Sequence, residues 1–279
     1  LISASNEIER LKSLGFVDWQ ADSFGVRLKE AINHRSISFP EEVYQSEELT
    51  RESFWSRYRV EVLASELKKS QVDVILELGG GDGRVSIPLI SQGFGVISIE
   101  PFYDGCRKVA RYGIPIFCGT IENLDIPQES IGAIGFFDVL EHIEDESGFL
   151  SSVHRTLSPQ GKIYLTVPAH DWLFSDHDEA LGHHRRYSRK TLKRTLEESG
   201  FTIERIDFLF SVLVLPAMLL RRMPYLFGMR KDSKVVIQRA ETVLRLPFVV
   251  DRLMLFVCRI ERFLKLPFGL SLFVVASKK

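Results

Sequence analysis

The sequence predicts an α/β protein built on a doubly wound, mostly parallel sheet of seven strands, the last of which is antiparallel. From Val74 onward, short apolar runs alternate with helical stretches, a pattern that buries a parallel sheet beneath helices on both faces. A glycine-rich turn, Gly79 to Gly83, follows the first apolar run and leads into a helix. An N-terminal helical segment and a helical insertion before the last strand complete the predicted fold.

The predicted elements follow one another in chain order. Strands are expected at 73–78, 95–100, 114–118, 131–137 and 161–167, and helices at 83–92, 104–112, 145–157 and 188–199. Ser188 can cap the last of these helices, and Gly200 can end it in a left-handed turn. Residues 201–210 and 269–276 are then predicted to pair as an antiparallel hairpin at the sheet edge.

The chain of 279 residues is predicted to be one catalytic domain with additions. The expected parts are an N-terminal helical extension or lid, the central ligand-binding domain, an apolar and basic helical insertion, and the last strand of the sheet, at 1–70, 71–210, 211–268 and 269–279.

Composition excludes several classes of protein. Lys and Arg number 36 against 37 Asp and Glu, so no net charge attracts a nucleic-acid backbone, and nucleic acid is not an expected partner. The three cysteines lack C-x-x-C spacing, which fits a reducing compartment, and we expect a cytoplasmic protein. The longest nearly uncharged apolar run, 208–220, is shorter than the ~20 residues of a membrane-spanning helix.

The insertion at 211–268 is apolar and basic together, as in Leu219-Leu220-Arg221-Arg222. One interpretation is that its helices pack over the catalytic domain or against a second subunit, which would make a homodimer. The other is peripheral contact with a membrane surface. Amphipathicity alone does not choose between them.

The glycine turn and the acid that follows it indicate an adenosyl ligand. The glycines fall at 79, 81 and 83, and Arg84 stands where a dinucleotide fingerprint requires its third glycine, which argues against a nicotinamide oxidoreductase. About 20 residues on, Glu100 ends the second predicted strand, where its carboxylate can accept hydrogen bonds from both ribose hydroxyls.

Four segments in succession resemble the motifs of the class I S-adenosylmethionine-dependent methyltransferases. They are Glu77 to Gly83, Ile99-Glu100, Gly119 to Asp125 and Phe137 to His142. The resemblance implies S-adenosylmethionine as the methyl donor and S-adenosylhomocysteine as the product.

The resemblance also implies a role for each matching position. The methionine half of the cofactor is expected at Glu77, Gly79, Gly81 and Gly83, the ribose at Glu100, the adenine at Thr120 and Ile121, and the floor beside the sulfonium at Phe137, Asp138 and Val139. The family often has Asp where this chain has Thr120, so a backbone contact at Ile121 is expected to serve the adenine amino group.

A segment upstream of the first strand resembles one that closes over the cofactor in a bacterial and archaeal branch of these enzymes. It makes Phe54, Trp55 and Arg57 further candidate contacts. The alternative is a packed helix with exposed arginines.

The acceptor is expected at the loops after residues 137 and 167, because ligands of open parallel sheets bind beyond the carboxyl ends of the strands. Six of the seven histidines lie between 142 and 184. His142, His183 and His184 are the catalytic candidates, since a hydroxyl acceptor must lose a proton. The candidates to orient the imidazole ring are Asp171, Asp176 and Asp178.

Further residues of these loops are expected to bind the acceptor, namely His170, Arg185, Arg186 and Tyr187. The arginines can clamp an anionic group at the start of a helix, or they pair with nearby acids such as Glu179. No resident metal is expected. The alternative is a cation held by Asp138, Glu141 and His142 with His183 or His184.

Residues 168–188 and the terminal 266–271 resemble a methyltransferase subgroup often of unassigned substrate. We therefore expect S-adenosylmethionine-dependent transfer to a small-molecule or lipid-linked acceptor, at oxygen, in a cytoplasmic protein with optional contact to the membrane surface. The alternative is a non-catalytic adenosyl-binding or interaction protein with a methyltransferase fold.

Overall fold

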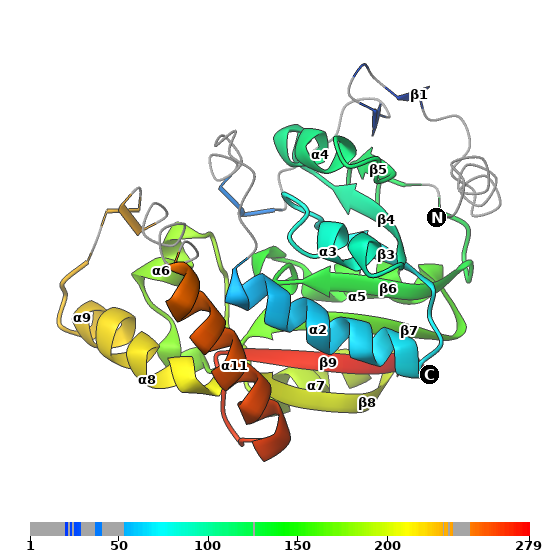
Figure 1. Ribbon diagram of the computed structural model, residues 1–279. Helices are drawn as coiled ribbons and strands as arrows, with labels where there is room; N and C mark the ends of the chain where they lie inside the picture. The colour runs from blue at the N-terminus through cyan, green and yellow to red at the C-terminus, as the bar shows by residue number, and fades with distance from the viewer. Residues whose placement is uncertain are drawn as a thin grey trace.

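A single mixed sheet forms the centre of the computed structural model, which describes residues 20–21, 23, 25–28, 37–40, 53–124, 126–230, 232–233, 235–236 and 246–279. The described strands lie in the order β1-β2-β5-β4-β3-β6-β7-β9-β8 (Figure 1). Their bounds are Gln20–Ala21 (β1), Val26–Leu28 (β2), Val74–Leu78 (β3), Gly95–Glu100 (β4), Ile116–Cys118 (β5), Ile131–Phe137 (β6), Leu157–Pro168 (β7), Phe201–Leu209 (β8) and Ser271–Lys278 (β9).

The strands from β3 to β9 confirm the predicted doubly wound architecture. Strands β5, β4, β3, β6 and β7 are parallel, and β9 runs antiparallel to both of its neighbours, β7 and β8. The predicted hairpin of the two last strands is therefore correct, with β8 at the sheet edge.

The opposite edge of the sheet differs from the prediction. The N-terminal segment is predicted to be helical, but β2 pairs in parallel with β5, and β1 pairs with β2. Strands of two and three residues are too short to show a hydrophobic period, so the sequence carries no signal for them.

Helices cover both faces of the sheet (Figure 1). Their bounds are Phe54–Lys69 (α2), Ser86–Ser91 (α3), Tyr103–Ala110 (α4), Glu146–Thr156 (α5), Asp176–Ala180 (α6), Arg189–Glu198 (α7), Val214–Ala217 (α8), Met223–Leu226 (α9) and Phe248–Leu264 (α11). Short 3₁₀ turns at Leu140–His142 (η2), Asp171–Leu173 (η3) and Ser211–Leu213 (η4) and a π turn at Met218–Arg222 (η5) complete the described helical elements.

The two faces of β3 belong to two different cores, because successive side chains of a strand point to opposite sides. Leu76 and Leu78 pack with residues of α5 and α7, whereas Ile75 packs with α2 and α3. Buried on both sides, the strand reads as a continuous apolar run interrupted only by Glu77.

The insertion is attached to the body of the protein through α11 and α2. Asp251 is buried, accepts a hydrogen bond of 2.6 Å from the backbone N–H of Phe54, and pairs with Arg57. Leu255 and Cys258 turn the inner face of α11 to the core. Among the described residues, no helix is long and apolar enough to cross a bilayer.

We predict that Asp251→Ala lowers the free energy of unfolding by about 1–3 kcal/mol, because it leaves the buried Phe54 N–H and the Arg57 guanidinium without their acceptor. Urea unfolding followed by circular dichroism measures this. The control is Arg252→Ala, an exposed neighbour that should change stability by no more than about 0.5 kcal/mol. Equal stability of the two variants would contradict the role of Asp251.

Candidate functional site

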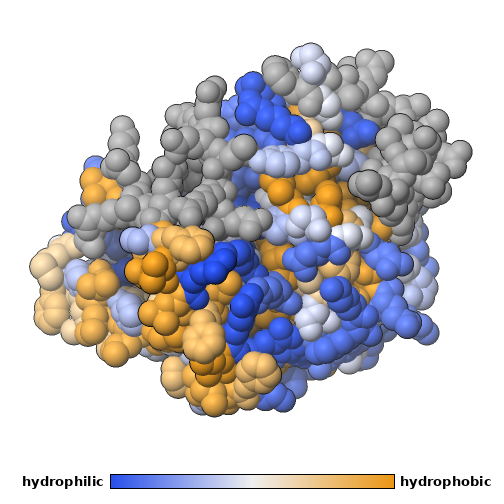
Figure 2. All heavy atoms as spheres, in the orientation of Figure 1, coloured by the Kyte–Doolittle hydropathy of each residue, from blue (hydrophilic) through white to orange (hydrophobic). Residues whose placement is uncertain are grey.

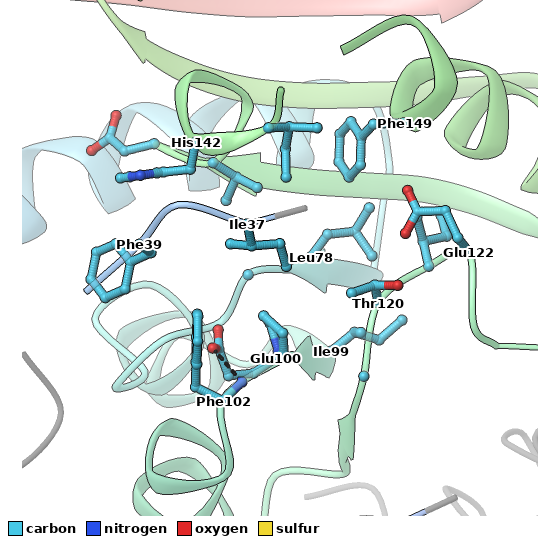
Figure 3. Close-up of a pocket in the computed structure, with 17 residues that line it drawn as sticks. Ile37, Phe39, Leu78, Ile99, Glu100, Phe102, Thr120, Glu122, His142 and Phe149 are labelled. Carbon is cyan, nitrogen blue, oxygen red and sulfur yellow. Dashed lines mark hydrogen bonds between the residues drawn. The ribbon is translucent and has the colours of Figure 1, made fainter. Parts of the chain in front are cut away.

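A cavity opens at the carboxyl ends of β3, β4 and β6, and apolar side chains line it together with a few polar groups, as is typical of small-molecule sites. Figure 3 shows Glu100 and Phe102 on one side of it and His142 and Phe149 on the other. The site lies where the sequence places it, beyond the strands that carry the glycine turn and Glu100.

The glycine turn fits closely under the end of β4. The backbone N–H groups of Gly79 and Gly80 donate to the carbonyl of Ile99 at 2.8 and 3.2 Å. A Cβ on Gly80 would collide with Oγ of Ser98, and Gly79 has a positive φ of 71°. Only glycine suits both positions, so the backbone of the turn is open to a ligand.

The Glu100 carboxylate connects the ends of two strands. It is 2% exposed, and its Oε2 accepts from the Gly81 N–H at 2.8 Å while Oε1 accepts from the Phe102 N–H at 3.0 Å. These two hydrogen bonds fix the carboxyl group at the mouth of the glycine turn, where it lines the cavity.

The cavity brings together six of the ten predicted cofactor residues, which are Gly79, Glu100, Thr120, Ile121, Asp138 and Val139. The other four are Glu77, Gly81, Gly83 and Phe137, and they do not line it. Gly81 instead holds Glu100 through its N–H.

Glu77 and Phe137 miss the cavity because they point to the opposite face of the sheet. Glu77 is buried beneath the turn and accepts a hydrogen bond from Ser86. Burial raises the pKa of Glu77 to about 8, and the Ser86 hydrogen bond opposes this. Phe137 packs in the core beneath α2. Both side chains therefore pack on the face of the sheet opposite the cavity.

The segment at 53–59 begins α2, which agrees with the packed-helix alternative and leaves contacts of Phe54, Trp55 and Arg57 with the cofactor as predictions. Trp55 stacks on Phe210 with a ring separation of 3.7 Å, and Arg57 pairs with Asp251. The arginine that reaches the site is Arg59, which binds the Asp138 carboxylate.

Residues 37–40 complete the cavity wall, and sequence reasoning missed them. Ile37 forms an antiparallel bridge with Ile143, and Ser38 donates from its Oγ to the carbonyl of His142 at 3.1 Å. The Phe39 ring meets the His142 ring edge-on at 5.1 Å. This short apolar stretch has no motif, so no sequence signal distinguishes it.

His142 lies in the cavity wall at the end of η2 and is 6% exposed. Burial lowers its pKa to about 3, and the nearby His183 adds to the effect. The imidazole is therefore neutral at physiological pH. Its Nδ1 is buried without a hydrogen-bond partner.

The other two catalytic candidates occupy different surroundings. His183 lies beside His142, with 4.7 Å between the ring centres, and its Nδ1 is 2.9 Å from Oδ1 of Asp178. Of the three aspartates considered, the orienting one is thus Asp178. His184 is exposed and does not line the cavity, which weakens its assignment as a catalytic residue.

The arginines after His184 are engaged in ion pairs, which favours the alternative to an anion clamp. Arg186 donates from Nε to Asp178 at 2.7 Å, and Arg185 lies 3.1 Å from Glu146. Burial alone would raise the pKa of Asp178, but its hydrogen bond with His183 and the charge of Arg186 hold that pKa well below its ordinary value. The predicted partner, Glu179, binds Tyr225 and Arg230 instead.

His170 and Tyr187, predicted to bind the acceptor, lie outside the cavity wall. The His170 ring stacks on Phe208 at 5.3 Å, and the buried Tyr187 hydroxyl donates to Glu146 at 2.7 Å. Both contacts stabilise the loop that carries them. The role of His170, Tyr187 and the two arginines in acceptor binding stays a prediction.

Glu141, His142 and His183 place their ligand atoms within 4.8 Å of one another, a spacing that can hold a metal ion. The Asp138 carboxylate, part of the alternative metal set considered from the sequence, accepts from Thr166 at 3.0 Å and binds Arg59.

Comparison with known proteins agrees with this geometry. A family model described as a methyltransferase domain matches residues 49–206. A protein of Mycolicibacterium smegmatis named a probable S-adenosylmethionine-dependent methyltransferase is 27% identical over 162 residues, which cover 56% of this chain and 62% of that protein. The ubiquinone biosynthesis O-methyltransferase of Rickettsia conorii is 29% identical over 130 residues, 43% of this chain and 45% of that one. The chain thus spans less than two thirds of the length of these relatives.

Solved structures share the fold. A Galdieria sulphuraria protein described as a sarcosine dimethylglycine methyltransferase superposes with a TM-score of 0.52 at 17% identity, covering 79% of this chain and 84% of the other. The [4+2]-cyclase SpnF gives 0.54 at 16% identity and covers 83% and 84%. At such identities the likeness establishes the fold alone.

We predict that Glu100→Gln lowers the free energy of unfolding by about 1–3 kcal/mol, because the new amide group turns a donor toward a buried backbone N–H. Chemical denaturation measures the loss. Asp104→Asn, an exposed change on α4, serves as the control and should be neutral within about 0.5 kcal/mol. A neutral Glu100→Gln would show that the carboxylate does not hold the two strand ends together.

Proposed function

This chain belongs to the methyltransferase domain family, and we propose that it transfers the methyl group of S-adenosylmethionine to an oxygen of a small-molecule or lipid-linked acceptor. The observation that carries the proposal is the cavity in which the glycine turn, the Glu100 carboxylate and the neutral His142 imidazole meet. The first two suit an adenosyl group, and the third suits a hydroxyl acceptor.

Each part of the cofactor has a matching part of the cavity. We assign the ribose hydroxyls to the Glu100 carboxylate, and the adenine to the wall formed by Thr120 and Ile121. The methionine half and the sulfonium lie along Gly79 and Asp138, where the backbone approaches closely and a carboxylate faces positive charge. Glu77 supports the glycine turn and does not touch the ligand.

The reaction is an in-line displacement at the methyl carbon. A lone pair of the acceptor oxygen forms the new O–CH₃ bond while the C–S bond breaks, and its electron pair passes to sulfur, giving S-adenosylhomocysteine. The hydroxyl proton passes to the neutral His142 imidazole in the cavity wall. The apolar walls of Phe39, Ile143 and Phe149 exclude water from the oxygen, which favours its attack.

The choice of oxygen rests on two supports. The ubiquinone biosynthesis relatives are named O-methyltransferases, although they align with less than half of this chain. The neutral imidazole at the cavity wall suits an acceptor that carries a proton. The second candidate is a non-catalytic adenosyl-binding protein, because a fold does not by itself fix an activity.

We predict micromolar binding of S-adenosylmethionine and S-adenosylhomocysteine and no binding of NADH in isothermal titration of the purified protein. Glu100→Gln should weaken the affinity for S-adenosylhomocysteine by about 10–100-fold, because charged hydrogen bonds contribute about 1.5–3 kcal/mol each. Asp104→Asn should bind as the unchanged protein does. Binding of NADH in place of the sulfur ligands would overturn the proposal. Turnover is then sought with phenols, sugars and lipid-linked alcohols, and binding without turnover across these acceptor classes would favour the second candidate.

The exposed apolar face of the insertion is evidence for a lipid-linked acceptor. This face, visible as the orange area over α8, α9 and α11 in Figure 2, carries large side chains that the body of the protein leaves uncovered. Val249 is 75% and Phe263 is 85% exposed. The members of the apolar face are Leu215, Leu219, Leu220, Leu226, Phe227, Phe248, Val249, Leu253, Phe256, Ile260, Phe263 and Leu264.

We assign the apolar face to the surface of an anionic membrane. Exposed cations lie among its apolar side chains at Arg252 and Lys265, and the Arg252 guanidinium stacks over the Phe248 ring at 4.6 Å. Apolar side chains that enter a bilayer interface beside cations that meet anionic headgroups are typical of peripheral membrane helices. A second subunit is the competing partner for the same face.

We predict that the protein sediments with vesicles of phosphatidylglycerol and phosphatidylcholine, and that Leu220→Asp with Phe263→Asp weakens this binding by at least about tenfold. The control is Tyr112→Asp, an exposed aromatic beyond the end of α4, which should bind vesicles normally. A stable dimer in analytical ultracentrifugation that the double variant dissociates, with no vesicle binding, would assign the face to a second subunit.

A further inference from the structure

The Glu141 carboxylate is buried beside the cavity with no visible partner. The residue is 0% exposed, and neither carboxylate oxygen accepts a hydrogen bond in the described part of the protein. Burying an unpaired carboxylate costs several kcal/mol, so such groups are normally paired or bind a cation. The backbone carbonyl of Glu141 does have a hydrogen-bond partner, because it accepts from the His184 N–H at 2.9 Å. In the described part of the chain, the side-chain oxygens have none.

Two imidazoles face the same point as this carboxylate. The buried Nδ1 of His142 has no hydrogen-bond partner, and the His183 ring lies edge-on to the His142 ring at 4.7 Å. One ligand atom from each of Glu141, His142 and His183 falls within 4.8 Å of the other two. Atoms that each bind one metal ion at about 2.0–2.2 Å lie at most about 4.4 Å apart, so small side-chain shifts would bring the three ligand atoms onto a single ion.

His183 is oriented for metal binding by a carboxylate on its other side. Its Nδ1 bonds to Oδ1 of Asp178 at 2.9 Å, which leaves Nε2 as the nitrogen with a free lone pair. Asp178 is itself held by Arg186. Metal-binding histidines commonly donate their second ring N–H to a carboxylate in this way. The alternative metal set considered from the sequence already includes Glu141, His142 and His183. The fold selects Asp178 as the carboxylate beside His183 and leaves out Asp138, which pairs with Arg59.

The local charge balance also favours a cation. Arg59 is paired with Asp138, and Arg186 is paired with Asp178. With both guanidinium groups paired elsewhere, Glu141 has no ion pair among the described residues, and burial together with Asp138 raises the pKa of its carboxyl group well above the ordinary value. A cation bound there would take the place of the carboxyl proton.

We propose that Glu141, His142 and His183 bind one divalent transition-metal ion in the wall of the cavity. Two imidazoles and one carboxylate favour Zn²⁺, Fe²⁺, Co²⁺ or Mn²⁺ over Mg²⁺, which prefers oxygen ligands and bound water. Three protein ligands leave at least one coordination position open.

The consequence for the reaction rests on the proposed function. His142 lines the cavity whereas Glu141 and His183 do not, so an ion held by all three would meet the acceptor on the His142 side. The ion would lower the pKa of a hydroxyl bound there, and the oxyanion would be the nucleophile for the methyl carbon. The acceptor class is then a hydroxyl compound whose oxygen binds the metal directly, and His142 acts as a ligand in place of a base.

The test measures metal binding without any turnover. Protein that carries no polyhistidine tag is treated with EDTA, desalted and titrated with Co²⁺, followed by its visible absorption, and with Zn²⁺, followed by calorimetry. One ion should bind per chain. Glu141→Gln and His183→Ala should each weaken binding by more than the about 10–100-fold loss caused by changes outside the ligand set. His184→Ala, the exposed neighbour of His183, should keep full affinity.

Each variant is accepted as folded when its circular dichroism spectrum matches that of the unchanged protein. Should a ligand variant fail to fold, electron spin-echo modulation of Cu²⁺ bound to the unchanged protein counts the coordinating imidazoles, and the expected number is two. Absence of bound metal, unchanged affinity in Glu141→Gln and His183→Ala, or a modulation without two imidazoles would overturn the inference. S-adenosylhomocysteine titration of the same samples tests the proposed function separately, so either idea can fail alone.

Discussion

The rest of the site depends on one interaction, the Glu100 carboxylate bound to two backbone N–H groups. Gly81 belongs to the turn after β3, and Phe102 follows β4, so a single buried side chain fixes two neighbouring strand ends at one distance. The glycine turn can then pack directly against the Ile99 carbonyl. Charged hydrogen bonds in a buried setting are strong, and they set this geometry before any ligand arrives. The cavity is therefore preorganised.

Much of the fold could be predicted from the sequence because its strands are buried on both faces and read as continuous apolar runs. A motif on a strand is less informative about its individual side chains. Glu77 and Phe137 match family positions, yet both side chains point away from the cavity, because alternate residues face opposite sides. The sequence could not assign residues 37–40 to the site for another reason. Their place beside His142 depends on contacts across about 100 positions of the chain.

The same limit applies to the histidine-rich loop, where the sequence alone does not show which histidine has which chemical role. Sequence reasoning could locate a concentration of imidazoles near the acceptor, but it could not separate His183 from its neighbour His184. The fold separates them, because Asp178 holds one ring in the interior and the other is left in solvent. Arg185 and Arg186 do not form a free anion site for the same reason, because Glu146 and Asp178 already pair with them.

The position of β9 affects how the protein is made. This strand lies between β7 and β8, and it comes after every other strand of the sheet in the order of synthesis. Until it leaves the ribosome, β8 has no partner and the edge of β7 stays open. The nascent chain therefore carries an unpaired strand and an exposed apolar insertion together, a combination that invites aggregation. Chaperone binding to the emerging 201–268 region would protect it until the last strand closes the sheet.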